Sequence, residues 1–146
     1  MKPSDFFTKE QQKQITDAIK EAELNTSGEI RVHIESSCKK DVLDKASYIF
    51  NLLGMQKTKL RNGVLFYLAV KDKKFAILGD VGINEKVPDN FWEDIKAKML
   101  ADFKNDEFAK GLSEGIIMAG EQLKAHFPYQ SDDVNELTDD ISFGEK

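Results

Sequence analysis

The fold of this chain is decided by residues 62–82, which read NGVLFYLAVKDKKFAILGDVG. Two apolar runs, 63–70 and 75–79, flank a short charged run, a pattern typical of two strands joined by a turn. If these strands pair antiparallel, the start of the first lies beside the end of the second. The polar, glycine-containing ends at 62–63 and 79–80 then become neighbours at one edge of a sheet. This arrangement predicts a ligand site at that edge.

Length and composition favour one soluble globular domain. The chain has 146 residues, of which 40% are hydrophobic and 32% charged, as expected for a water-soluble protein with a single core. No apolar run approaches the roughly 20 residues that cross a bilayer, and the first residues lack the apolar core of a signal peptide. A single cysteine, Cys38, excludes an internal disulfide. We therefore expect a cytoplasmic protein that is not embedded in a membrane.

The net charge of −5 is concentrated at the C-terminal end. Residues 131–146 hold six acidic residues and one lysine, so residues 1–130 are electrically neutral. A neutral body with an acidic end argues against nonspecific nucleic-acid binding, which needs a basic face. We expect one folded domain over residues 1–130 and a solvated, mobile tail over residues 131–146. Attraction of a metal ion and docking of a protein partner are the alternative roles for this tail, in which residues 141–143 (ISF) could dock onto a surface.

Helix and strand signals alternate along the rest of the chain. A capping box at 8–11 (TKEQ) begins a first helix, and strict alternation at 29–35 (EIRVHIE) indicates a strand with one buried face, or an edge strand. Further helices are expected after Asp41, from Pro88 and after 105–106. The helical crossover between the first two strands makes them parallel, and the third strand returns antiparallel. The sequence thus predicts an α/β fold with a small mixed sheet covered by helices.

The predicted strand directions bring polar residues from distant segments to one edge of the sheet. The first two strands start level with each other and the third ends beside them, so Glu29, Asn62 and Asp80 converge there. The turn at 105–107 is a further source of oxygen ligands. Carboxylate and amide oxygens suit Ca²⁺ or Mg²⁺ better than zinc, which prefers Cys and His. Asn, Asp and Gly are also common turn formers and helix caps, so this structural interpretation stays open.

Other catalytic arrangements find no support in the spacing of residues. His33 lies on the polar face of its strand and His126 near the end of the last helix, and we expect both on the surface. Residues 79–82 (GDVG) lack the lysine and the full glycine pattern of a phosphate-binding loop. Arg31 and Arg61 would either meet an anionic group near the predicted edge or form surface salt bridges.

Three groups of short motifs occur in a fixed order along the chain. They are SGEI at 27–30, NGVL at 62–65 with the charged turn KDKK at 71–74, and FKNDEF at 103–108 followed by GL at 111–112. Together they resemble the TPM domain family, which is named for thylakoid proteins of photosystem II repair and includes bacterial relatives. The likeness runs from about residue 7 to residue 126. It implies a small three-layer α/β/α sandwich.

The resemblance also implies chemistry that the residues alone do not. A plant member of the family is described as an acid phosphatase, several members bind Ca²⁺ or other divalent ions, and others resemble accessory or assembly proteins for membrane complexes. Carried over by position, the implied metal site is Glu29, Asn62, Asp80 and Asp106, with Ca²⁺ or Mg²⁺ as the cofactor. Asn84 stands where many members have an acid, a departure that would weaken a cation site or change its ligands.

The sequence therefore supports two hypotheses from different functional classes. In the first, a TPM-like domain binds a divalent cation at a sheet edge and has weak metal-linked phosphatase activity, although whether it is an enzyme stays open. In the second, the domain is a noncatalytic protein-interaction or assembly module whose cation, if any, is structural. Its partner would then be a protein that docks on the helical surface or on the acidic tail.

Overall fold

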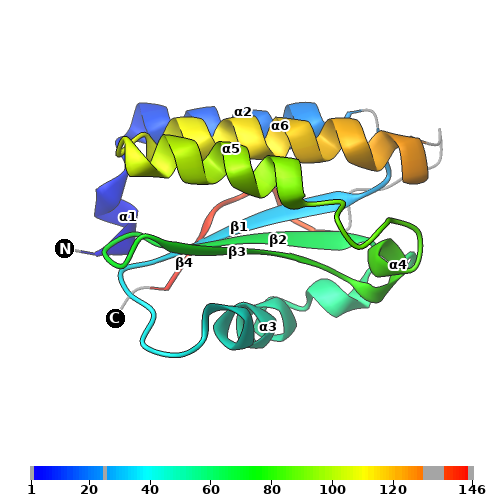
Figure 1. The fold of residues 1–146 in the computed structure, drawn as a ribbon, viewed down its shortest axis with the longest axis horizontal. Coiled ribbons are helices and arrows are strands. Elements are labelled where there is room, and N and C mark those ends of the chain that lie inside the picture. The colour runs from blue at the N-terminus through cyan, green and yellow to red at the C-terminus, as the bar shows by residue number, and fades with distance from the viewer. Residues whose placement is uncertain (1, 25, 130–136, 145–146) are drawn as a thin grey trace.

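The computed structural model describes residues 2–24, 26–129 and 137–144, which form three layers (Figure 1). A mixed four-stranded sheet lies between three helices on one face and one helix on the other. The covering helices are α2 (Lys9–Glu23), α5 (Glu93–Lys104) and α6 (Phe108–His126) on one side and α3 (Val42–Leu52) on the other, with the short helices α1 (Pro3–Phe6), η1 (Met55–Lys57) and α4 (Val81–Asn84) at the periphery. The expected α/β/α sandwich is confirmed.

The sheet has the strand order β3-β2-β1-β4. Its strands are β1 (Glu29–Glu35), β2 (Gly63–Ala69), β3 (Lys74–Gly79) and β4 (Ser142–Phe143). Strand β1 runs parallel to β2 and to β4, whereas β3 runs antiparallel to β2. The helical crossover and the hairpin expected from the sequence are therefore confirmed.

Two cores lie on opposite faces of the sheet and explain the unbroken apolar run of β2. Val64, Phe66 and Leu68 point into the core beneath α2, α5 and α6. Leu65 and Tyr67 point into the smaller core above α3. Because successive side chains of a strand alternate between faces, a strand covered on both sides needs apolar residues at every position.

Glycines in α6 let the neighbouring helices approach closely. A Cβ atom added to Gly115 would lie 2.7 Å from Sδ of Met99 in α5, and one added to Gly120 would lie 2.7 Å from Cα of Ala22 in α2. The absence of side chains at these positions is thus part of the packing between the three helices. In the ranges that the structure describes, no helix combines the length and apolarity needed to cross a membrane.

Two helices begin later than the sequence predicts. Helix α5 starts at Glu93, because Pro88 and the residues after it form turns, in which the amide N of Phe91 donates to the carbonyl O of Pro88 at 3.0 Å. Helix α6 has Glu107 as its N-cap residue, not residue 105 or 106. Asp106 has φ +59°, a left-handed conformation that turns the chain between the two helices and cannot serve as a cap.

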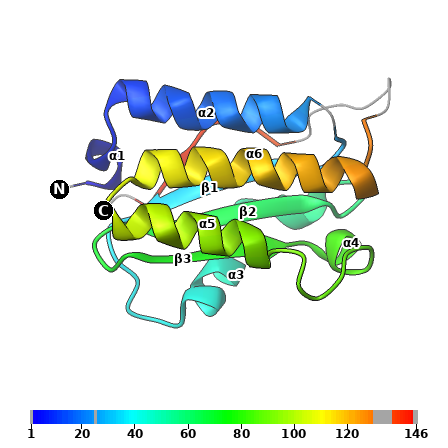
Figure 2. The ribbon, with the colours of Figure 1, turned by 45° about the horizontal axis from the view of Figure 1, so that its top comes forward.

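Residues 137–144, which the sequence assigned to a solvated tail, lie along β1 (Figure 2). Ser142 is level with His33, and the amide N of Gly144 donates to the carbonyl O of Ile34 at 2.9 Å. The predicted tail also includes residues 131–136 and 145–146, which lie outside the described residues. The described part of the tail therefore adds an edge strand to the sheet.

Candidate functional site

Three of the four predicted site residues lie at one edge of the sheet. Glu29 opens β1 opposite Gly63, the first residue of β2, and its amide N donates to the carbonyl O of Asn62 at 3.2 Å. Asp80 follows β3, and its amide N donates to the carbonyl O of Gly63 at 3.0 Å. The strand directions predicted from the sequence thus bring Glu29, Asn62 and Asp80 together.

The Asp80 carboxylate forms a bidentate ion pair with Arg61. Arg61 donates from Nε at 2.8 Å and from Nη2 at 2.9 Å, and the amide N of Val81 donates to the same carboxylate at 2.7 Å. These hydrogen bonds to Asp80 raise the pKa of Arg61. The Asp80 side chain is 4% exposed, but that of Arg61 is 45% exposed. A buried carboxylate therefore has a counter-ion that solvent reaches.

The backbone around this pair is tightly built. Arg61 has φ +51°, and its carbonyl O accepts a hydrogen bond from the amide N of Gly82 at 2.9 Å. A Cβ atom on Gly82 would lie 2.3 Å from the carbonyl O of Leu60, so glycine is required there. The GDVG run is therefore a close contact between α4 and the turn before β2.

Glu29 and Asn62 are committed to partners inside the protein. Glu29 is 4% exposed and Asn62 is 1% exposed. The Glu29 Oε1 atom accepts a hydrogen bond from the amide N of Leu137 at 2.6 Å, and Asn62 Nδ2 donates to the carbonyl O of Ser27 at 3.1 Å. Both side chains thus join separate segments of the chain at this edge.

The structure does not bring Asp106 to the same edge. Asp106 is exposed and forms an ion pair with Lys73 at 2.9 Å, in the turn between β2 and β3. That turn lies at the opposite end of the strands from Asn62 and Asp80. The reason is the direction of α5, whose 12 residues carry the chain about 18 Å along the sheet before Asp106 is reached.

A pocket of about 170 Å³ lies beside the Arg61–Asp80 pair. The residues that line it include Ser47, Asn51, Gln56 and Asn84, whose side chains carry neutral oxygens. The Oε1 atom of Gln56 is buried and has no hydrogen-bond partner among the described residues. One carboxylate surrounded by neutral oxygens is a donor set that Ca²⁺ and Mg²⁺ accept. We call this cavity the Asp80 pocket.

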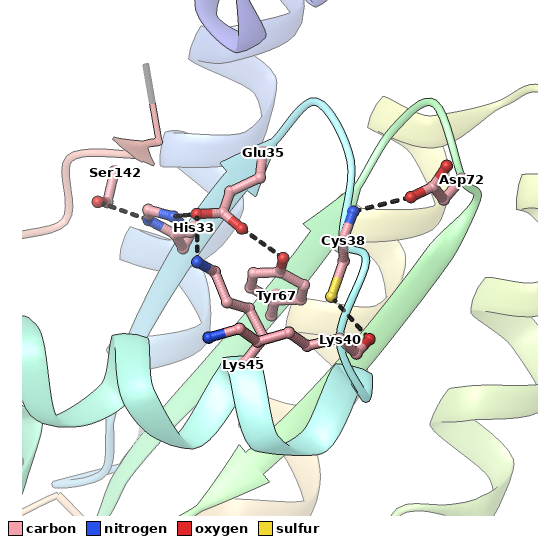
Figure 3. Close-up of polar contacts among 8 residues, drawn as sticks. All are labelled: His33, Glu35, Cys38, Lys40, Lys45, Tyr67, Asp72 and Ser142. Carbon is pink, nitrogen blue, oxygen red and sulfur yellow. Dashed lines mark hydrogen bonds and ion pairs between the residues drawn. The ribbon is translucent and has the colours of Figure 1, made fainter. Parts of the chain in front are cut away.

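A second polar cluster, which sequence reasoning missed, surrounds Glu35 at the other end of β1 (Figure 3). Glu35 accepts a hydrogen bond from the hydroxyl of Tyr67 and contacts Nε2 of His33 at 3.1 Å and Nζ of Lys45 at 3.8 Å. Nδ1 of His33 lies 2.8 Å from Oγ of Ser142. A pocket of about 330 Å³ lies against Glu35 and Lys45. Both oxygens of Glu35 are already occupied, so the cluster fixes β1 in place.

Burial sets the protonation of this cluster. Desolvation lowers the pKa of His33 despite the opposing effect of Glu35, so the ring is neutral at pH 7. A neutral ring that donates a hydrogen bond from Nε2 to Glu35 accepts one from the Ser142 hydroxyl at Nδ1. Desolvation and the hydrogen bond to Glu35 raise the pKa of Tyr67.

The expected surface position of His33 is wrong, because the ring is buried beneath the C-terminal segment. No sequence signal marks this contact, since Ser142 lies 109 positions after His33. His126 is half-buried, and its ring lies against that of Phe91, with 5.7 Å between centroids.

Solved structures show that this arrangement of elements is shared. The chain is 50% identical to the BA42 protein from the psychrophilic bacterium Bizionia argentinensis, over 95% of this chain and 96% of that one, with a TM-score of 0.91. An N-terminal domain from P. gingivalis has 20% identity and a TM-score of 0.68, over 83% of this chain and 78% of that one. An N-terminal domain from Corynebacterium glutamicum has 14% identity and a TM-score of 0.68, over 90% of this chain and 82% of that one. These two likenesses show the fold alone.

A comparison with protein families points in the same direction. No curated protein matches the chain significantly. The model of the TPM domain, in contrast, matches residues 1–122, which include β1, β2, β3 and the Asp80 pocket. This match covers most of the chain and agrees with the motifs at the starts of β1 and β2. The chain therefore belongs to the TPM domain family.

Proposed function

We propose that this TPM domain binds a divalent cation, Ca²⁺ or Mg²⁺, in the Asp80 pocket, where the cation replaces the Arg61 guanidinium. One observation carries the proposal: a buried carboxylate faces a pocket of neutral oxygens and is neutralised by a half-exposed arginine. A divalent ion carries more charge than a guanidinium, and it takes carboxylate and amide oxygens as ligands. Gln56, whose Oε1 atom has no hydrogen-bond partner among the described residues, is one of the residues that line the pocket.

The proposed ligands differ from the set predicted from the sequence. Asp80 is retained, whereas Glu29 and Asn62 hold the sheet edge together and Asp106 lies at the other end of the strands. Among residues 2–24, 26–129 and 137–144, no three His, Cys, Asp or Glu residues are grouped to hold a metal ion. With one carboxylate and several neutral oxygens, we expect weak binding, with a Kd on the order of 10⁻⁴–10⁻³ M.

A Ca²⁺ titration of the ¹⁵N-labelled full-length chain tests this proposal. We expect saturable amide shifts around residues 47–56 and 79–84. Asp80→Asn should abolish them, and Asp106→Asn, a matched control at the far end of the sheet, should leave them unchanged. Shifts that survive in a folded Asp80→Asn variant, or shifts confined to residues 131–146, would contradict the proposal.

Weak phosphatase activity is a further part of the same proposal. A bound divalent cation would polarise a phosphoryl oxygen and lower the pKa of a water molecule. The contribution of the chain is to hold that ion through Asp80 and to orient the ester with the amides that line the pocket. Hydrolysis of p-nitrophenyl phosphate should fall to background in Asp80→Ala. Unchanged hydrolysis in this variant would indicate a contaminating enzyme.

The second candidate is a noncatalytic interaction module in which any cation is structural. The observation that favours it is the C-terminal segment, which lies along β1 as an extended peptide. An edge that binds one extended peptide through its main chain has the chemistry to bind another.

A further inference from the structure

The outer edge of β1 recognises the main chain of the segment 137–144. Glu29 Oε1 accepts a hydrogen bond from the amide N of Leu137 at 2.6 Å. Further along the edge, Arg31 Nη2 donates to the carbonyl O of Asp140 at 3.2 Å. Contacts of this kind tolerate many side chains, as in proteins that bind peptides by adding a strand.

Two positions of the segment are recognised through their side chains, and a third has no room for one. The Asp139 carboxyl shares a hydrogen bond with that of Glu23, and the Ser142 hydroxyl meets the ring of His33 at 2.8 Å. At Gly144 a Cβ atom would lie 2.6 Å from Glu35 Oε2, so no side chain fits. These contacts require an acid, a hydroxyl and a glycine at fixed spacing.

The alternate residues of the segment face the other way. Ile141 and Phe143 are partly buried against the core beneath α2. They alternate with Ser142 and Gly144, which face the side chains of His33 and Glu35, as expected for an extended strand. The edge therefore selects for an extended peptide with the pattern acid-x-apolar-hydroxyl-apolar-Gly.

The segment pairs as a strand with only part of this edge. Strand β4 has two residues, whereas β1 has seven. At the start of β1 the amide N of Ile30 donates to Glu23 Oε2 at 2.9 Å, not to a strand. The Nε atom of Arg31 is buried and lacks a hydrogen-bond partner within the described part of the chain. A partner strand that pairs with more of β1 could place an acceptor beside this Arg31 donor, which the chain's own segment does not.

We infer that the outer edge of β1 is a strand-addition site for an extended peptide segment of a partner protein, with the pattern acid-x-apolar-hydroxyl-apolar-Gly, and that residues 139–144 fill it in cis. The inference deepens the interaction-module candidate, on which it rests, and is independent of cation binding. The chain's own segment competes with the partner, because its attachment gives it a high effective concentration at the edge. The partner peptide therefore reaches the edge of β1 only when that segment is displaced.

The test uses the full-length chain with Gly144→Val, which places a side chain against Glu35 and weakens the cis segment. The probe is a fluorescein-labelled peptide with the sequence of residues 137–144, LTDDISFG. We expect the Gly144→Val chain to bind this peptide at least tenfold more tightly than the wild type. The matched control peptide, LTDDISFV, carries the same clash. It should bind to the Gly144→Val chain at least tenfold more weakly than LTDDISFG does.

Amide spectra of the same samples separate the outcomes. In the Gly144→Val chain, β2 signals should stay dispersed while those of Ser142 and His33 move, which shows a folded protein with a released segment. A released segment without peptide binding overturns the inference. The interaction-module candidate would then survive only as a module that docks through its helices. Unchanged Ser142 and His33 signals also overturn it, since the edge would then tolerate a side chain at position 144.

Discussion

The Glu23 carboxyl accepts a hydrogen bond from the amide N of Ile30 at 2.9 Å and shares another with Asp139. Burial, followed by the contact with Asp139, raises the pKa of Glu23 to about 9 from its usual 4.5. The folded protein therefore keeps Glu23 protonated at neutral pH, where the unfolded chain ionises it. The carboxyl acts as a neutral group that joins α2, β1 and the C-terminal segment.

We predict that Glu23 makes stability fall as pH rises. Between pH 4.5 and about 9 the unfolded chain has lost this proton and the folded chain has not, so each step up in pH favours unfolding. Glu23→Gln imitates the protonated group and should flatten the dependence, with a higher Tm than the wild type at pH 8. Thermal unfolding followed by circular dichroism from pH 5 to 9 checks this. Parallel plots of Tm against pH for the two proteins would rule out a protonated Glu23 in the folded protein.

Tyr67 donates a hydrogen bond from its hydroxyl to the Glu35 carboxylate, whose side chain is only 13% exposed. We predict that Tyr67→Phe lowers the free energy of unfolding by about 1–3 kcal/mol, because a buried acceptor loses its donor. Tyr48→Phe is the matched control, since Tyr48 is 60% exposed, and it should cost under about 0.5 kcal/mol. Urea unfolding measures the free energy of unfolding of both variants. Equal losses would contradict a stabilising role for the hydrogen bond from Tyr67 to Glu35.

At the level of elements, the order of helices and strands was enough to predict the edge that holds Asn62 and Asp80. A helical crossover dictates parallel strands, and a short polar turn dictates a hairpin, so the register at Glu29 and Asp80 follows. The assignment of Asp106 to this edge came from the oxygen-rich turn at 105–107 and from family resemblance, not from strand direction. Its displacement follows from α5, which runs the length of the sheet before Asp106 is reached.

The C-terminal strand could not be predicted in the same way. Strand β4 has two residues, too few for any alternation to emerge, and it lies within an acidic stretch whose composition is typical of a solvated end. The burial of His33 depends on that strand and was missed with it. The pairing of Arg61 with Asp80 depends on side-chain geometry, so the sequence left Arg61 between an anion contact and a salt bridge.

The crossing of α2 and α6 gives a prediction at the element scale. Alanine is intrinsically better than glycine in a helix by about 1 kcal/mol, yet Gly120→Ala should destabilise the protein by about 1–3 kcal/mol. The reason is the backbone of Ala22, 2.7 Å from the added Cβ atom. Lys124→Ala, on the exposed side of the same helix, should change stability little. Chemical denaturation distinguishes the two, and a stabilised Gly120→Ala would contradict the close crossing.

Across the whole molecule, residues 137–144 close an otherwise open side of the sheet. Deleting residues 137–146 exposes His33, the Glu29 carboxylate and the apolar surface under Ile141 and Phe143. We predict a loss of roughly 2–4 kcal/mol, from the area uncovered, without loss of the β1–β2–β3 sheet. Amide exchange should then accelerate in β1 far more than in the central strand β2. Equal exchange in both strands would mean that the segment is not part of the domain's stability.

In the proposed function, a divalent cation and Arg61 compete for Asp80. Calorimetric titration of Ca²⁺ into the wild type and Arg61→Gln, at one fixed ionic strength, tests this competition most directly. Removing the competing guanidinium should tighten binding at least threefold, and binding should vanish in Arg61→Gln combined with Asp80→Asn. Equal or weaker affinity in a folded Arg61→Gln variant would contradict the exchange and favour the interaction module.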